Sequence, residues 1–239
     1  MTEQLFKRLD RLFLKLDHTA LLVEQTLADA LFATATMSVE IAQQVIDGDE
    51  DIDRREVEIE RECIRLLALY QPAAIDLRRI CFVIKVNNDL ERIADHAVSI
   101  ARFAKTLAGI GMTVTAMESY RTLADSVTDA LHQTMRLLAP ATDGTDESKE
   151  SFSEDSPLIK LAQWIILNDK KTVDVKFRDF LNEVISSEKF PETSRLNAVY
   201  ALTSIGRNLE RIGDQCKNIA EDSIFLKTGE IVRHAPKTE

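Results

Sequence analysis

The chain has 239 residues, of which 45% are hydrophobic and 29% charged, and it contains only seven glycines and five prolines. That balance favours helices and supplies few of the turn residues on which strand-rich folds depend. The formal net charge is −10 and no long basic run is present. Because phosphate contacts need clustered lysine and arginine, this argues against a nucleic-acid platform and favours cations or basic protein surfaces as partners.

Apolar residues recur at helical spacing along most of the chain and predict six helices. The predicted helices cover residues 3–32, 38–70, 74–108, 114–139, 157–187 and 193–227. Pro72, a pair of glycines at positions 109 and 111, and Pro191 separate several of them. The polar, acidic stretch at 140–157 is expected to be a mobile loop.

The three cysteines, Cys63, Cys81 and Cys216, lie inside apolar helical patterns and lack CxxC spacing. We therefore expect them to pack as small hydrophobic residues with free thiols, which suits a reducing compartment. No apolar run approaches the roughly 18 residues of a membrane span, and the amino terminus lacks the pattern of a signal peptide. These features together predict a cytoplasmic protein.

Two stretches in the two halves of the chain are nearly the same: NNDLERIADHAVSIA at residues 87–101 and RNLERIGDQCKNIAE at 207–221. They align at one offset, which carries residue 91 onto residue 210. The same offset aligns two seams of mostly apolar residues, Val83, Val86, Leu90, Ile93, Ala97, Ile100, Ala104 and Leu107 with Leu202, Ile205, Leu209, Ile212, Cys216, Ile219, Ser223 and Leu226. Spacings of three and four keep each seam on one side of a helix. We predict an all-α fold of two tandem, pseudo-symmetric three-helix bundles, residues 1–109 and 110–239.

The repeated stretch also carries a pair of acids that faces away from the seam. Glu91 and Asp95 lie four residues apart on one helix, and Glu210 and Asp214 repeat the pair. Like charges at this spacing repel by about 0.3 kcal/mol, and both halves keep that cost. A bound cation would offset it, although the neighbouring arginines could supply part of the compensation.

The helix predicted at 38–70 carries a second acidic stripe, formed by Asp49, Asp53, Glu56 and Glu60. If this helix and the next form an antiparallel hairpin around Pro72, Asp49 faces Asp95 and Asp53 faces Glu91. Four carboxylates in one groove make an all-oxygen site that suits Mg, Mn or Fe ions. A salt-bridged surface without metal is the alternative that the residues themselves leave open.

The two repeated stretches, together with YQPAAIDLRRI at 70–80 and NIAEDSIFLKTGEIVRH at 218–234, resemble the PhoU family of regulators of bacterial phosphate uptake. The resemblance spans essentially the whole chain and implies two PhoU-like three-helix bundles with metal clusters on their surfaces. It places metal ligands at Asp49, Asp53, Glu91, Asp95, Asp174, Glu210 and Asp214. Lys170 stands where the pattern has Asp49, and Asp169 beside it could only partly substitute. We therefore expect metal mainly in the first half.

Other residues near these acids have less specific expectations. His96 follows Asp95 and is expected to lie at the surface or behind a ligand. Asn218 could donate to a ligating carboxylate or be an ordinary surface residue.

The resemblance also implies a function. Similar proteins couple the phosphate ABC transporter to a membrane-bound sensor histidine kinase and repress the phosphate-starvation response when phosphate is plentiful. This implies a negative regulator, a signalling adaptor that reaches the membrane through the transporter's ATPase subunit and the kinase. We also expect a homodimer that binds no nucleic acid.

Two other classes remain open. A carboxylate-bridged metalloenzyme of the ferritin type needs Glu-x-x-His pairs inside a four-helix core, and no histidine in the chain follows a glutamate by three residues. A helical scaffold without metal would differ from the regulator only in metal content and partners. The sequence contains no Gly-rich phosphate loop and no GxSxG, so we expect no enzyme.

Overall fold

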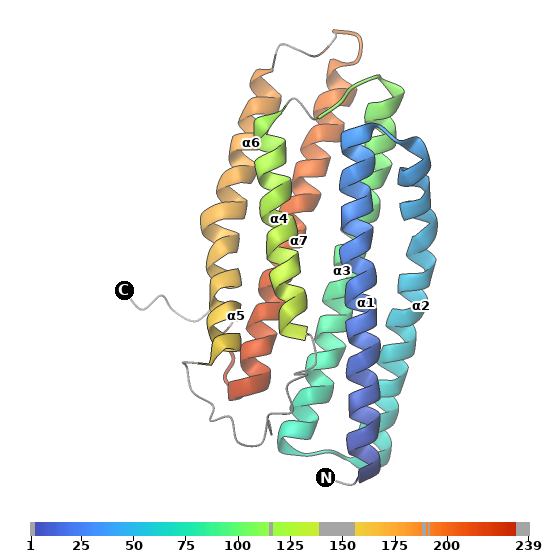
Figure 1. Cartoon of the computed structure of the whole chain (residues 1–239), viewed down its shortest axis with the longest axis vertical. Coiled ribbons are helices and arrows are strands. Elements are labelled where there is room, and N and C mark those ends of the chain that lie inside the picture. The colour runs from blue at the N-terminus through green and yellow to red at the C-terminus, as the bar shows by residue number, and fades with distance from the viewer. Residues whose placement is uncertain (1–2, 115–116, 139–155, 188–189, 191, 233–239) are drawn as a thin grey trace.

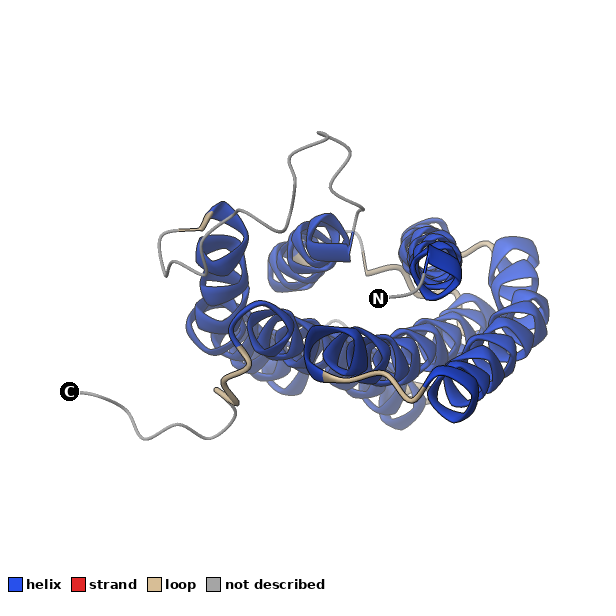
Figure 2. Ribbon diagram, turned by 90° about the horizontal axis from the view of Figure 1, so that it is seen from below, coloured by secondary structure: helices blue, strands red, loops and turns tan. Residues whose placement is uncertain are grey.

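The structure is a computed structural model that describes residues 3–114, 117–138, 156–187, 190 and 192–232. Its helical elements are α1 (Glu3–Thr36), α2 (Val39–Tyr70), α3 (Ala74–Gly109), α4 (Glu118–Leu138), α5 (Pro157–Asn168), η1 (Asp169–Val173), α6 (Asp174–Ser186) and α7 (Arg195–Thr228), as Figure 1 shows. The described residues form no strand (Figure 2), which confirms the all-α prediction. The stretch predicted as a mobile loop, 140–157, lies outside the described residues except for its last two positions.

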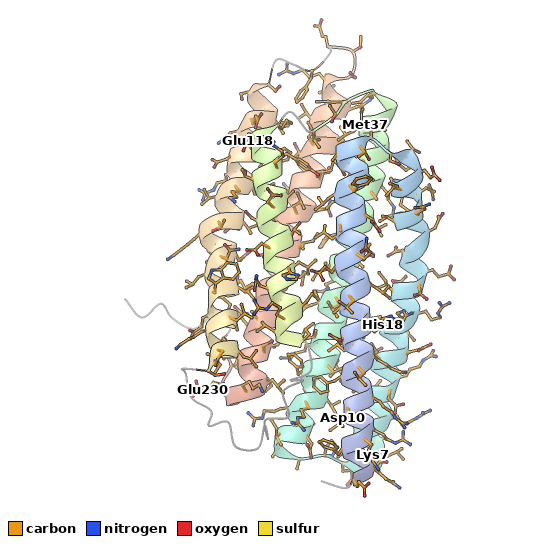
Figure 3. The ribbon with its side chains drawn as sticks, in the orientation of Figure 1. Lys7, Asp10, His18, Met37, Glu118 and Glu230 are labelled. Atoms are coloured by element: carbon orange, nitrogen blue, oxygen red, sulfur yellow. The ribbon has the colours of Figure 1, made fainter. Side chains whose placement is uncertain are left out.

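Local backbone features explain where the first two helices end. Met37, at the turn between α1 and α2 (Figure 3), has a left-handed φ of 57°. Ser38 then caps α2, because its side-chain oxygen accepts a hydrogen bond of 3.3 Å from the backbone N–H of Ile41. Gln71 ends α2 with a left-handed φ of 44°, and Pro72 prevents the helix from continuing.

The fifth predicted helix differs from the expectation of one regular helix over 157–187. α5 and α6 form a single rod (Figure 1), but the π turn η1 interrupts it. In this turn the backbone N–H of Asp174 donates to the carbonyl oxygen of Asp169, five residues earlier instead of four. The π turn therefore contains one residue more than a regular α-helical turn. As a result, the register of α5 is shifted relative to that of α6.

Each half of the chain packs its helices around one long helix. α1, α2 and α3 contact one another in the first half, and α4 and the α5–α6 rod contact α7 in the second. α3 and α7 run antiparallel and share the most extensive contact in the molecule (Figure 1). This arrangement confirms two three-helix bundles, which are joined mainly through α3 and α7. The division at residue 109 stays a prediction.

The predicted apolar seams lie in the core. All the seam residues on α3 are buried, and so are those on α7 as far as Ile219. Ser223 and Leu226 are partly exposed and line a cavity of about 20 Å³ together with Phe82. The cysteine thiols are free, with Cys63 and Cys216 buried among apolar neighbours.

Within the described part of the chain, none of the helices combines the length and the apolar composition that a membrane crossing requires.

Candidate metal centre

The groove between α2 and α3 carries the four acids predicted for the first half. The two helices pack closely on one another as an antiparallel hairpin (Figure 1). Four apolar residues of these two helices are buried in the core: Ile52, Ile59, Leu90 and Ile93. With these residues in the core, Asp49 and Glu91 are half-buried at the edge of the groove, and Asp53 and Asp95 are exposed. The acids thus lie outside the core.

The carboxylates in this groove are close enough to act on one another. Burial raises the pKa of Asp49, and the negative charges of Asp53 and Asp95 raise it further. Burial likewise raises the pKa of Glu91, with added effects from Asp95, Asp53 and Glu56. The interactions of Asp49 with Asp95 and of Glu91 with Asp53 cross from one helix to the other. The groove therefore concentrates negative charge that a cation would stabilise.

One carboxylate oxygen in this groove has no hydrogen-bond partner among the described residues. Oδ1 of Asp49 is buried and has no hydrogen-bond partner in the described structure. A buried carboxylate oxygen without a partner is unfavourable, so a hard cation with a preference for oxygen ligands fits here. As the side chains stand, no three histidine, cysteine or carboxylate groups among the described residues are close enough to hold one ion. A cation would have to draw the exposed carboxylates of Asp53 and Asp95 inward by side-chain rotation.

Two polar residues expected near the acids make other contacts. Nδ1 of His96 lies 2.9 Å from Oδ1 of Asn208, so His96 joins α3 to α7, and its burial lowers its pKa. Asn218 donates through Nδ2 to Oε1 of Gln215 at 3.2 Å, one turn earlier on α7. The side chains of both residues are thus held by amides.

The second half has a matching acidic groove between the α5–α6 rod and α7. Burial raises the pKa of Glu210, the charges of Asp214 and Asp174 raise it further, and the charges of Arg211 and Arg207 oppose the rise. The structure therefore brings the three acids expected in this half within electrostatic reach of one another.

Lys170 was expected at the place of Asp49 in this groove, and this expectation is wrong. Lys170 is exposed, whereas Asp169 is only 4% exposed and interacts with Asp214 and Asp174. The reason is the π turn, whose extra residue turns Asp169 inward and Lys170 outward. Asp169, and not Lys170, therefore lies with the other acids of this groove.

Lys217 is a further residue of this groove that the sequence reasoning missed. Its Nζ atom lies 3.6 Å from Oδ2 of Asp169, and its side chain is 22% exposed. Burial raises the pKa of Asp169 to about 6, and the positive charge of Lys217 opposes that rise. A signal for Lys217 was present in the sequence, because the repeat offset aligns this lysine with the apolar residue Val98.

Comparison with known proteins agrees with the doubled helical architecture. The family model for the PhoU domain matches the chain twice, at residues 16–104 and 134–223. A protein of Pseudomonas putida named phosphate-specific transport system accessory protein PhoU homolog is 36% identical over 216 residues, which are 89% of this chain and 76% of that protein.

Two solved structures share the fold over nearly their whole length. The crystal structure of PhoU from Pseudomonas aeruginosa matches with a TM-score of 0.80 and 31% identity, covering 94% of this chain and 99% of that one. The phosphate transport system regulatory protein PhoU from Streptococcus pneumoniae matches with a TM-score of 0.76 and 26% identity, covering 95% and 99% of the two chains. The repeated domain, the sequence identity and the shared fold together place this chain in the PhoU family.

Proposed function

We propose that this protein is a negative regulator of phosphate uptake and of the phosphate-starvation response. The observation that carries the proposal is the match of both halves to the PhoU domain, with a relative named as an accessory protein of phosphate-specific transport. The proposed partners are the ATPase subunit of a phosphate ABC transporter and a sensor histidine kinase. A cytoplasmic homodimer would dock on both from the inner side of the membrane.

The adaptor works, in this proposal, by binding the partner states unequally. A regulator shifts an equilibrium between two states of its partner only by the difference in its affinity for them. Two bundles joined along α3 and α7 give a broad surface for such recognition. No catalytic step is assigned to the chain.

We further propose that Fe, Mn or Mg binds in the groove between α2 and α3. Asp49, Asp53, Glu91 and Asp95 would hold it through carboxylate oxygens, and the buried Oδ1 of Asp49 supports this assignment. The bound ion would neutralise the concentrated charge and fix the outer face of the hairpin. Asp174, Glu210 and Asp214 would form the weaker counterpart in the second half.

Deletion of the gene tests the regulatory role. In phosphate-rich medium the deletion strain is expected to express phosphate-scavenging genes that the parent represses, and the wild-type gene supplied in trans is expected to restore repression. Complementation with the Glu91→Ala, Asp95→Ala variant asks whether the acidic groove is needed, and we expect it to fail. Unchanged expression in the deletion strain would count directly against the proposal.

A further inference from the structure

The π turn η1 gives the second groove an acid that the helical pattern alone would not provide. In α2, Asp49 and Asp53 share one side because they are four residues apart. Asp169 and Asp174 are five residues apart, and a π turn brings residues at this spacing onto one side of the helix. Both acids interact with Asp214 on α7 or with its neighbour Glu210. The second groove therefore contains four carboxylates, as the first does.

α7 leaves room for the inward-turned Asp169 at Gly213. A Cβ atom at position 213 would lie 3.1 Å from Oδ1 of Asp169 and 3.0 Å from Cγ1 of Val173. The repeat offset aligns Gly213 with Ala94 of the first half, where α2 is a regular α-helix. The glycine thus allows the wider π turn to pack against α7.

Asp169 is a buried carboxylate that lies among other negative charges. Its side chain is almost completely buried, and its Oδ1 atom has no hydrogen-bond partner in the described part of the chain. The nearby charges of Asp174 and Asp214 are negative and make its ionised form less favourable. A buried carboxylate in such a place requires a positive charge beside it.

Lys217 supplies that positive charge from within the chain. Its ammonium approaches Oδ2 of Asp169 to 3.6 Å, and most of its side chain is shielded from solvent. The first groove has Val98 at the corresponding position and so has no ammonium there. Arg102 also lowers the pKa of Asp49 by its charge, but this is the smallest of the effects on that group, and Arg102 is exposed.

We propose that the second groove, as it stands, does not fit a divalent cation, because the Lys217 ammonium is the resident cation beside the buried carboxylate of Asp169. Lys217 competes with the metal for the same carboxylates, so the second half binds a divalent ion weakly until that charge is removed. This inference rests on the proposed metal-binding role of the acidic grooves. It assigns the difference between the halves to Lys217 and not to the exposed Lys170.

The test uses the full chain with its first groove disabled by Glu91→Ala and Asp95→Ala. Into this background we introduce Lys217→Met, which removes the charge and keeps the length of the side chain. Lys170→Met in the same background is the matched control, because it removes an equal charge from an exposed position nearby. Mn²⁺ binding is measured by titration calorimetry after treatment with a chelator, and thermal unfolding is followed with and without Mn²⁺.

Lys217→Met is expected to strengthen Mn²⁺ binding by about tenfold or more, since an ammonium beside the ligands repels a dication. Mn²⁺ should also raise the unfolding midpoint of this variant, because the ion replaces the lost partner of Asp169. Lys170→Met should bind Mn²⁺ like the background. Equal Mn²⁺ affinity in the Lys217→Met variant and the background would overturn the proposal, and so would equal gains in both lysine variants.

Two further variants keep the test decisive. If Lys217→Met does not fold, Lys217→Gln removes the charge while keeping a hydrogen-bond donor, and the same outcomes apply. Adding Asp169→Asn to either variant should abolish the gained Mn²⁺ binding. A wild-type protein without metal, combined with Mn²⁺ binding by Lys217→Met, would refute metal binding in the first groove while supporting the role of Lys217. Metal in the wild-type protein, combined with no gain of Mn²⁺ binding in Lys217→Met, would refute only the proposed role of Lys217.

Discussion

Nζ of Lys85 on α3 lies 3.0 Å from Oδ1 of Asp222 on α7, so an ion pair joins the two halves of the molecule. The Asp222 side chain is 3% exposed, and the same ammonium lies 5.2 Å from the ring centre of Phe225. Lys85→Met removes a positive charge that pairs with a buried carboxylate. We expect the free energy of unfolding to fall by about 2 kcal/mol, measured by urea denaturation.

A surface ion pair provides the control for that substitution. Lys7 and Glu3 form an ion pair at 2.6 Å on α1, with both side chains largely exposed. Lys7→Met should change the free energy of unfolding by less than about 0.5 kcal/mol. Similar losses for the two lysine variants would show that the contact between α3 and α7 does not depend on the buried pair.

Two helical glycines are expected to respond oppositely to alanine. Gly48 on α2 has open space where a Cβ atom would lie, so Gly48→Ala should stabilise the protein by up to about 1 kcal/mol through helix propensity. At Gly206 on α7 a Cβ atom would lie 2.7 Å from the ring of Phe180, a buried residue. Gly206→Ala should therefore destabilise by about 1–3 kcal/mol. Thermal unfolding of both variants checks the signs, and a stabilising Gly206→Ala would contradict the close packing of α6 on α7.

The buried acid Asp169 predicts a dependence of stability on pH in the presence of a chelator. Its pKa is raised to about 6, mainly by burial, whereas in the unfolded chain an aspartate titrates near about 3.9. A raised folded-state pKa gives stability that is present below about pH 4 and lost as pH rises through about 6. The loss amounts to about 3 kcal/mol.

Comparison with Asp169→Asn isolates this effect from the other acids. Because the variant does not titrate at this position, its stability relative to wild type should increase between about pH 4 and pH 6.5. Denaturation curves recorded across this range provide the measurement. Parallel dependence on pH in the two proteins would mean that Asp169 is not held in the buried position that the π turn gives it.

The proposed metal site predicts the metal content of the purified protein. Glu91→Ala with Asp95→Ala should remove most bound Fe, Mn or Mg, as measured by elemental analysis, while the helical circular-dichroism signal persists. The fold should persist because neither residue belongs to the apolar seam, and the adjacent Leu90 is fully buried. Glu210→Ala with Asp214→Ala is the matched control and should lower the content less. Equal content in wild type and the first double variant would place the metal elsewhere.

Much of the fold could be predicted because one physical signal recurs throughout the chain. Buried apolar residues such as Leu90 and Leu209 belong to patterns with spacings of three and four. Such spacings are typical of the buried side of a helix. Helix ends were predicted to within a few residues where a proline or glycine marks them. The antiparallel hairpin also predicted that Asp49 and Asp95 would interact, and the structure places them within electrostatic reach.

The second groove could not be predicted in the same way. A π turn adds one residue to an otherwise helical pattern, and this addition leaves no clear mark in the sequence. The five-residue spacing of Asp169 and Asp174 can be explained by the turn but does not predict it. The repeat showed that Lys217 aligns with an apolar residue of the first half, but it did not indicate that Asp169 would be its partner. Contacts between the halves, such as that of His96 with Asn208, depend on how α3 and α7 cross, which the sequence repeat does not specify.

The most direct test of the account is anomalous diffraction at the manganese absorption edge from crystals of the full chain grown with Mn²⁺. We expect an anomalous peak between α2 and α3, within coordination distance of oxygens from Asp49, Asp53, Glu91 or Asp95, and a weaker peak or none beside Lys217. A well-ordered groove without a peak at saturating Mn²⁺, or a strong peak only in the second half, would contradict it.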